Sequence, residues 1–246
     1  MCRHQRLAAS ARPLLQLVLL VSLTFMTSTA SASPNFPNES GRWTRLNDRT
    51  VALTGSIDAG SLFKFELVFE DQVDTVVLNS GGGYTHEALQ IGRILKDAEV
   101  DVVVDGICLS SCANYLFTVG RHKTIRDGVV GFHGNTRASV GQEGVDAFIE
   151  NLPSELNEAE QEAYRTELEQ TLAWERAFFA DLGIDQALFE RTHRPDKGMG
   201  DGKTYAFLLP TPATFARYGI LNVEGEQSMA VKRSVEEDLS MPLLVN

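Results

Sequence analysis

The chain has 246 residues, with 22 Lys and Arg residues against 33 Asp and Glu residues, and a formal net charge of −11. Hydrophobic residues make up 43% and charged residues 22%, which is ordinary for a globular protein and too apolar for a disordered one. The acidic balance argues against a nucleic-acid backbone or an anionic membrane surface as the main partner. Three cysteines are too few for a disulfide scaffold.

The first 32 residues have the pattern of a secretory signal peptide. A basic start with three arginines precedes an apolar run, Leu14–Met26, and the small-x-small sequence Ala30-Ser31-Ala32. The run is shorter than the ~20 residues of a membrane-spanning helix. We therefore predict cleavage after Ala32 and a periplasmic or secreted protein, with an uncleaved membrane anchor as the alternative. Such a protein folds in an oxidising compartment without ATP.

Residues 33–49 are rich in Pro, Asn and Ser and predict an N-terminal tether. Short β-branched runs then alternate with helical periods, a pattern typical of an α/β fold with a parallel sheet and helical crossovers. The expected strands are Thr50–Leu53, Asp74–Leu78, Val100–Val104, Thr124–Ile125 and Val129–Phe132. The expected helices are Leu62–Phe69, a helix from about Thr85 through Leu95, Cys112–Val119, Ile184–Thr192 and Pro212–Tyr218.

The segment 143–175 differs from the rest of the chain, because it carries ten acidic residues and one basic residue, Arg165. We interpret it as long helices with a solvated acidic face, inserted into the main domain at about 143–180 and lying outside its site. Residues 223–246 are polar and predict a peripheral C-terminal tail. The main domain is therefore expected over residues 50–222.

Three clusters next to predicted strands carry residue types that active sites use. In residues 79–83 (Asn-Ser-Gly-Gly-Gly), the glycines allow backbone N–H groups to point at an anionic oxygen. The segment lacks the spacing of a nucleotide-binding loop. Ser110 lies at a second strand–helix turn, and His133 follows an apolar strand, which suits a general base. The ordinary alternatives are a tight glycine turn, a serine that caps a helix and a structural histidine. The histidines lack metal-ligand spacing, so we predict no metal and no cofactor.

Five ordered motifs carry a resemblance. They are Leu53-Thr-Gly-Ser-Ile57, Leu78-Asn-Ser-Gly-Gly-Gly83, Gly106-Ile-Cys-Leu-Ser110, Gly131-Phe-His133 and Thr211-Pro-Ala-Thr-Phe-Ala-Arg-Tyr-Gly-Ile220. In this order they resemble the Clp-peptidase/crotonase superfamily, above all its exported, ATP-independent, Clp-protease-like bacterial members. The resemblance implies a ββα spiral with a mainly parallel sheet and an inserted helical region. It also implies a peptide or protein substrate, no ATPase partner and assembly into a homo-oligomer.

The resemblance also implies roles for individual residues. Ser110 matches the nucleophile of the Clp peptidases, and His133 matches their general base. The backbone N–H groups of Gly82 and Ser111 match the donors of the oxyanion hole.

The chain departs from the family pattern at two places. Gly81 stands where the family has a proline, which loosens the loop without removing donors. No aspartate stands where the third triad member is expected, near Tyr205–Phe207. Asp201 is the nearest candidate and Asp196 the next. Because loss of the orienting acid can reduce turnover about 10⁴-fold, this departure bears directly on activity.

Cys108 and Cys112 flank the serine at positions i and i+4, as in the Cys-x-Ser-x-Cys turn of the exported relatives. A separation of four residues near a first helical turn is compatible with a disulfide, and two buried thiols behind the serine are the alternative. Neither cysteine occupies the reactive position of the family.

We therefore expect an exported serine hydrolase, most simply a peptidase with a Ser–His site and a backbone oxyanion hole. The alternative is a catalytically inactive Clp-like module that binds or assembles in the periplasm. Acyl-CoA chemistry of the crotonase kind is disfavoured, because the chain is exported and has no catalytic Glu pair at the motifs.

Overall fold

The computed structural model describes residues 39–152 and 156–246, and the predicted signal peptide lies outside these residues. The strands are β1 (Arg42–Asn47), β2 (Thr50–Thr54), β3 (Thr75–Ser80), β4 (Asp101–Leu109), β5 (Lys123–Gly131), β6 (Leu208–Leu209), β7 (Val223–Glu224) and β8 (Leu244–Val245). The helices are α1 (Ser61–Glu66), α2 (Thr85–Asp97), η1 (Cys112–Phe117), α3 (Thr136–Val140), α4 (Gly144–Glu150), α5 (Glu158–Leu182), α6 (Ala187–His193), α7 (Pro212–Arg217) and α8 (Met229–Leu239).

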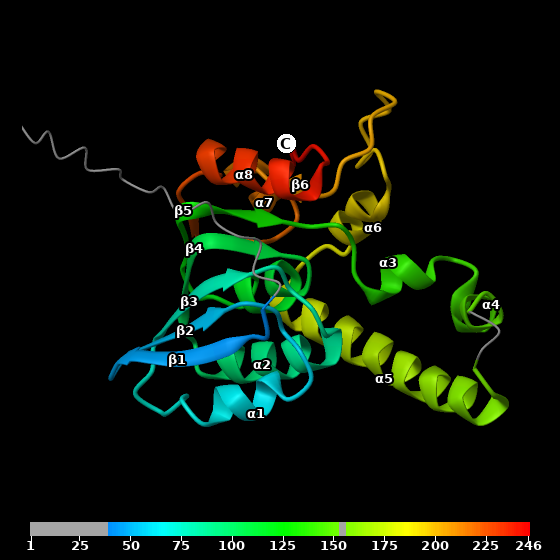
Figure 1. Ribbon diagram of the computed structural model, residues 1–246, viewed down its shortest axis with the longest axis horizontal. Helices are drawn as coiled ribbons and strands as arrows, with labels where there is room; N and C mark the ends of the chain where they lie inside the picture. The colour runs from blue at the N-terminus through cyan, green and yellow to red at the C-terminus, as the bar shows by residue number, and fades with distance from the viewer. Residues whose placement is uncertain (1–38, 153–155) are drawn as a thin grey trace, which may run out of the picture. The chain divides into compact units, whose positions relative to one another are not determined.

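A six-stranded sheet in the order β1-β2-β3-β4-β5-β7 forms the centre of the fold (Figure 1). The β1 strand is antiparallel to β2, and every other neighbouring pair is parallel. A second sheet pairs β6 with β8, and a bridge between Phe132 and Leu208 joins it to the chain leaving β5. The predicted α/β class with a mainly parallel sheet is therefore confirmed.

Helices α1 and α2 cover one face of the sheet (Figure 1). The α2 residues Leu89, Ile91 and Leu95 are fully buried, and Ile91 and Leu95, four residues apart, share one side of the helix. On the same side, a Cβ atom at Gly92 would stand 2.4 Å from the Tyr115 carbonyl oxygen. The glycine thus lets α2 approach the helix η1, which follows β4, at backbone distance.

The predicted tail is part of the core. Along β4 the burial alternates at first, but Ile107, Cys108 and Leu109 are all buried, so both faces of the sheet are covered there. Cys108 belongs to the main cluster, whereas Ile107 and Leu109 pack with Val235 of α8 and Leu243 before β8. The prediction that residues 223–246 form a peripheral tail is wrong.

Two other predicted boundaries change. Residues 42–47, predicted as part of the tether, form β1, an edge strand in which only Trp43 is buried. The two short strands predicted around 124–132 are one strand, β5, which runs through Gly128. A Cβ atom at Gly128 would stand 2.5 Å from the Gly106 carbonyl oxygen, so the glycine permits close contact with β4 and does not end the strand.

The acidic insertion is helical, as predicted, and its long helix α5 has two different halves. Asn157 and Glu160 form a capping box at the start of α5, and Phe178 and Phe179 near its end are buried in the main core. The outer half packs through Leu168 against α3 and α4, away from the sheet (Figure 1). Among the described residues, no helix combines the length and apolar character needed to cross a membrane.

Candidate active site

Ser110 occupies the turn between β4 and η1. Its φ of 56° lies in the left-handed region, which is costly for a residue with a Cβ atom and is found where function demands it. Two hydrogen bonds hold this conformation: the Ser110 N–H donates to the Gly131 carbonyl oxygen (3.0 Å), and the Asn114 N–H donates to the Ser110 carbonyl oxygen (2.9 Å). The turn is therefore anchored to β5 on one side and to η1 on the other.

The structure brings His133 next to Ser110, with 2.7 Å between the Ser110 Oγ and the His133 Nε2. This proximity follows from the sheet, because β4 and β5 are parallel neighbours and Leu109 pairs with Gly131. The residues just beyond them therefore emerge at the same edge. A distance of 2.7 Å is within reach of proton transfer when Nε2 is the unprotonated nitrogen.

The surroundings of His133 favour its neutral form. Burial by the residues around the ring, followed by the nearby Lys197 and His193, lowers the pKa of His133 from 6.5 to about 4. The residue is nevertheless exposed to solvent, and water around the ring opposes this shift. The ring also lies 4.9 Å from the ring of Phe207. A neutral imidazole at pH 7 can accept the serine proton.

The carboxylate predicted as the third triad member does not reach the histidine. Asp201 accepts hydrogen bonds from the Tyr205 hydroxyl (2.7 Å) and the Lys203 N–H (3.0 Å), and Asp196 accepts from the N–H groups of two loop glycines. In the described part of the chain, no carboxylate hydrogen-bonds or ion-pairs with His133. The assignment of Asp201 is therefore wrong, because its carboxylate instead closes the Gly-rich loop in which it lies.

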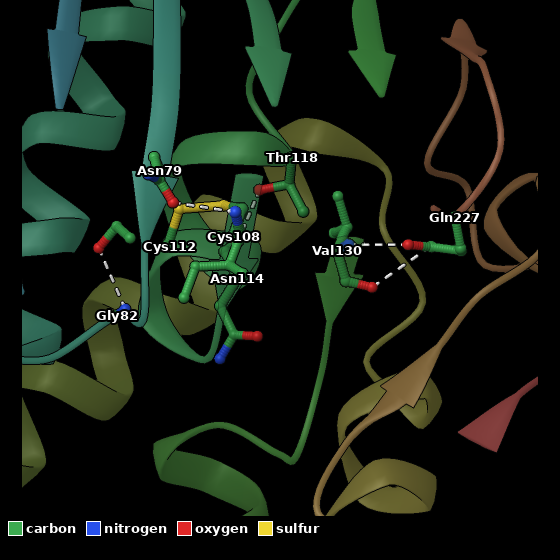
Figure 2. Close-up of a disulfide and its surroundings, with 10 residues drawn as sticks. Asn79, Gly82, Cys108, Cys112, Asn114, Thr118, Val130 and Gln227 are labelled. Carbon is green, nitrogen blue, oxygen red and sulfur yellow. Dashed lines mark hydrogen bonds between the residues drawn. A yellow bond between two sulfur atoms is a disulfide. The ribbon is translucent and has the colours of Figure 1, made fainter. Parts of the chain in front are cut away.

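The glycine loop after β3 fits against the serine turn. The Asn79 side chain accepts a hydrogen bond from the Ile107 N–H (3.0 Å), which ties the end of β3 to β4 (Figure 2). A Cβ atom at Gly82 would stand 2.7 Å from the Ser110 Cβ and 2.8 Å from the Ser111 nitrogen. Only a glycine with its φ of 91° allows this approach, so the glycine loop and the Ser110 turn share one surface.

The two predicted oxyanion donors have different environments. The Gly82 N–H donates to the buried Ser80 Oγ at 3.1 Å (Figure 2), so it is not available in this arrangement. The Gly83 N–H has no acceptor in the described residues, and Gly83 lines the pocket in front of Ser110. Ser111 begins the helical segment, where N–H groups lack intrahelical acceptors, and its hydroxyl donates to the Gly83 carbonyl oxygen (2.7 Å). The geometry thus favours Gly83 over Gly82 as the partner of Ser111.

A disulfide links Cys108 at the end of β4 to Cys112 at the start of η1 (Figure 2). The Cα atoms are 5.2 Å apart, and both residues are fully buried. The disulfide connects the two ends of the Ser110 turn. It therefore restricts the end of β4 and the start of η1, which determine the conformation of the serine.

Ser110 and His133 open into a cavity of about 620 Å³. One wall comes from the loops after β3, β4 and β5, and the other from the insertion. The prediction that the insertion lies outside the site is therefore wrong. The insertion side chains in the wall are Phe148 of α4 and Tyr164, Glu167, Leu168 and Thr171 of α5. Two histidines that the sequence did not place in a site, His86 and His193, also line the cavity.

Two other residues near the site lacked a clear sequence signal. Glu175 is the last acidic residue of the insertion, yet it is fully buried and hydrogen-bonded to Tyr115 of η1. Its position between Trp174 and the aromatic pair Phe178 and Phe179 is a hint of burial that its charge obscured. Asn114 is buried beside the serine turn, and nothing in its local sequence distinguishes it from an ordinary helical residue.

No protein-family model matches the chain, and no curated protein matches it significantly. In the described residues, no group of three or more His, Cys, Asp or Glu side chains is arranged to hold a metal ion. The features that bear on function are therefore the contact between the Ser110 and His133 side chains and the cavity around them.

Proposed function

We propose that this protein is an exported serine hydrolase, an ATP-independent peptidase with a Clp/crotonase-like fold. The observation that carries the proposal is the 2.7 Å contact between the Ser110 Oγ and the His133 Nε2 at the base of the cavity. The succession of β2, α1, β3, α2, β4 and η1 supports a ββα-type spiral, in which strand ends and helix starts meet at one edge.

The reaction follows from the positions of these groups. The neutral His133 Nε2 accepts the proton of Ser110 as the Oγ attacks a peptide carbonyl carbon, and the carbonyl π electrons move to the oxygen. The N–H groups of Ser111 and Gly83 stabilise this oxyanion. When the C–N bond breaks, protonated His133 gives its proton to the leaving amine. Water activated by His133 then hydrolyses the acyl-enzyme and restores Ser110.

The cavity supports a peptide or protein substrate. The insertion contributes Phe148, Tyr164 and Leu168 to the lining, together with the polar Glu167 and Thr171. A lining that mixes polar groups with apolar and aromatic side chains suits a peptide, which presents both main-chain amides and side chains. A volume of about 620 Å³ holds several residues of such a chain.

A fluorophosphonate probe tests the proposal, because it phosphonylates an activated serine and needs no knowledge of the substrate. The wild-type protein is expected to be labelled at Ser110, and Ser110→Ala to be unlabelled. Ser139→Ala is the matched control, since Ser139 lines the same cavity but its hydroxyl donates to the Asn135 carbonyl oxygen. If folded wild-type protein is not labelled at Ser110, the hydrolase proposal fails.

A second candidate is a catalytically inactive module that binds or assembles in the periplasm. Two observations favour it: the described residues supply no carboxylate to orient His133, and the Gly82 N–H is engaged by Ser80. In that case Ser110→Ala should preserve the cellular phenotype of the wild-type protein. Loss of the phenotype in that variant alone would exclude the module.

We also propose that the exported protein forms a homo-oligomer. The exposed acidic residues of α5 oppose close packing of two such helices, so any contact through them requires a basic partner surface. Light scattering at physiological salt measures the mass, and a monomeric value would refute the oligomer. Cell fractionation tests export independently.

A further inference from the structure

Glu175 of α5 links the helix after the nucleophile to the segment after the base. Its carboxylate accepts a hydrogen bond from the Tyr115 hydroxyl of η1. It also accepts from the N–H groups of Thr136 (3.1 Å) and Arg137 (3.2 Å), at the start of α3. Tyr115 follows Ser110 by five residues, and Thr136 follows His133 by three. One carboxylate therefore contacts both chain segments that carry the reacting side chains.

A second contact joins the same two segments. The Asn114 Nδ2 donates to the Gly134 carbonyl oxygen at 2.8 Å, and Asn114 is 3% exposed. Asn114 precedes Tyr115 on η1, and Gly134 is the residue after His133. The π-helical winding of η1 presents these two consecutive residues to the 134–137 segment, and such windings are common at functional sites.

The chemistry of Glu175 is unusual for a merely structural residue. It is fully buried, and no Lys or Arg side chain in the described part of the chain forms an ion pair with it. A buried carboxylate without a cation requires several strong donors, and here a phenol and two backbone N–H groups supply them. Burial together with the adjacent Glu175 raises the pKa of Tyr115 well above its ordinary value, so the phenol stays a donor.

We propose that Glu175 and Asn114 are positioning residues that together hold His133 at Ser110, the task that an orienting aspartate performs in a serine triad. The proposal depends on the proposed hydrolase function. The third triad acid acts directly on the imidazole ring, whereas Glu175 and Asn114 act on the backbone on the C-terminal side of His133. Because proton transfer requires the two side chains in contact, a displacement of about 1 Å is expected to cost about 10²-fold in rate.

Glu175→Gln is the main test. Its amide keeps one acceptor oxygen, but the NH₂ group faces the other N–H donor, so one of the two hydrogen bonds to the start of α3 is lost. The expected result is about 10²-fold slower phosphonylation of Ser110 at saturating fluorophosphonate, with unchanged half-saturation. Glu169→Gln is the matched control, because Glu169 is an exposed carboxylate on the same helix. Circular dichroism and denaturant unfolding give the folded fraction, by which each rate is divided.

Two milder variants address the case in which Glu175→Gln does not fold. Tyr115→Phe removes only the phenol oxygen, and Asn114→Leu removes the side-chain amide that donates to Gly134. Each is expected to slow labelling per folded molecule, and the effects of Tyr115→Phe and Glu175→Gln should be less than additive when the two are combined. Wild-type rates per folded molecule in all these variants would overturn the proposal.

A structural measurement separates this proposal from the hydrolase proposal. Crystal structures of the wild type and of Tyr115→Phe or Glu175→Gln report the distance between the Ser110 Oγ and the His133 Nε2 directly. The proposal expects this distance to exceed ~3.2 Å in the variants, whether or not the wild type reacts with the probe. An unchanged distance refutes the positioning role, whereas an unlabelled wild type with a lengthened contact in the variants refutes only the hydrolase.

Discussion

The backbone of Gly82 packs so closely against Ser110 that a Cβ atom at position 82 would lie 2.7 Å from the Ser110 Cβ. Gly82→Ala must therefore move the serine turn or the glycine loop, in addition to straining a φ of 91°. We expect labelling of Ser110 to fall by about 10²-fold or more, since a misplacement of about 1 Å has that effect. The second-order rate of fluorophosphonate labelling measures it.

Gly60→Ala separates strain from steric contact in this experiment. Gly60 has a φ of 82°, but a Cβ atom there would meet nothing within 4 Å. Gly60→Ala should therefore reduce the free energy of unfolding by about 1 kcal/mol and leave the labelling of Ser110 unchanged. Equal labelling of the Gly82 and Gly60 variants would contradict the close approach of the loop to Ser110.

The rate of Ser110 labelling is expected to persist to unusually low pH. An unfolded histidine has a pKa of about 6.5, and in the folded protein burial, with Lys197 and His193, lowers the pKa of His133 to about 4. Because the neutral ring is the active form, half of the rate should be lost at a pH between these values, well below 6.5. A midpoint at or above 6.5 would contradict the environment described for His133.

The same shift links His133 to stability. Between the two pKa values the unfolded state binds more protons than the folded state, so the free energy of unfolding should decrease as the pH falls from about 6.5 towards 4. Above 6.5 this contribution does not change with pH. Urea unfolding of the wild type and of His133→Gln across this range isolates it, because the variant lacks the titrating ring.

Lys197→Met is expected to shift the pH profile upward. Lys197 is 4% exposed and has no hydrogen-bond or ion-pair partner for its amine among the described residues, and its charge disfavours protonation of His133. Without that charge the pKa of His133 rises and the labelling midpoint moves to higher pH. Lys203→Met, on the exposed part of the same loop, should leave the midpoint in place. A downward shift in Lys197→Met would contradict the assignment.

Removal of the disulfide is expected to destabilise the fold. The chain-entropy relation gives about 2 kcal/mol for so short a loop, so Cys108→Ala/Cys112→Ala should lower the free energy of unfolding by about that amount. Because both cysteines are fully buried, a reductant should not reduce the disulfide of the native wild type until the protein unfolds. Mass spectrometry after alkylation tests this. Two thiols in oxidised native protein would show that the bridge is absent.

Gln227→Leu tests the role of the C-terminal segment. The Gln227 Oε1 accepts from the Val130 N–H (2.8 Å), and its Nε2 donates to the carbonyl oxygens of Val130 (3.3 Å) and Pro210 (2.9 Å), as Figure 2 shows for Val130. Each buried group left without a partner costs about 1–3 kcal/mol, so the loss should be at least about 2 kcal/mol in denaturant unfolding. Gln72→Leu, on an exposed turn, should cost almost nothing. Equal free energies of unfolding for Gln227→Leu and Gln72→Leu would indicate that the C-terminal segment is a peripheral tail.

The sequence predicts β2 and β3 closely, but it predicts β4 (Asp101–Leu109) only as far as Val104, before Gly106 interrupts the apolar run. In β1 Trp43 alone is buried and Arg45 is half-buried, whereas the other residues are exposed. An edge strand of that kind resembles a loop in composition. The C-terminal segment was missed for a related reason, since α8 buries only Val235 fully and β8 is too short to show a period.

The proximity of Ser110 and His133 is predictable from the sequence, because both residues lie where neighbouring parallel strands end, and that placement is encoded locally. The other groups near the site depend on distant parts of the chain. Glu175 is 42 residues beyond His133 in the sequence, and its contacts form only because α5 returns to the core. Proximity in sequence to a motif predicts Asp201, but its carboxylate bonds within its own loop, to Lys203 and Tyr205.

The two halves of α5 perform separate tasks on one continuous helix. Its inner turns, with Phe178 and Phe179, belong to the folding core, whereas Tyr164 and Leu168 face the cavity. The outer turns are not uniform, because Leu168 also packs with Val140 and Ile149, whereas Tyr164 and Glu167 line the cavity and are exposed. Substitutions at Tyr164 and Glu167 therefore change the cavity wall over an unchanged Ser110 and His133 without opening a buried cluster.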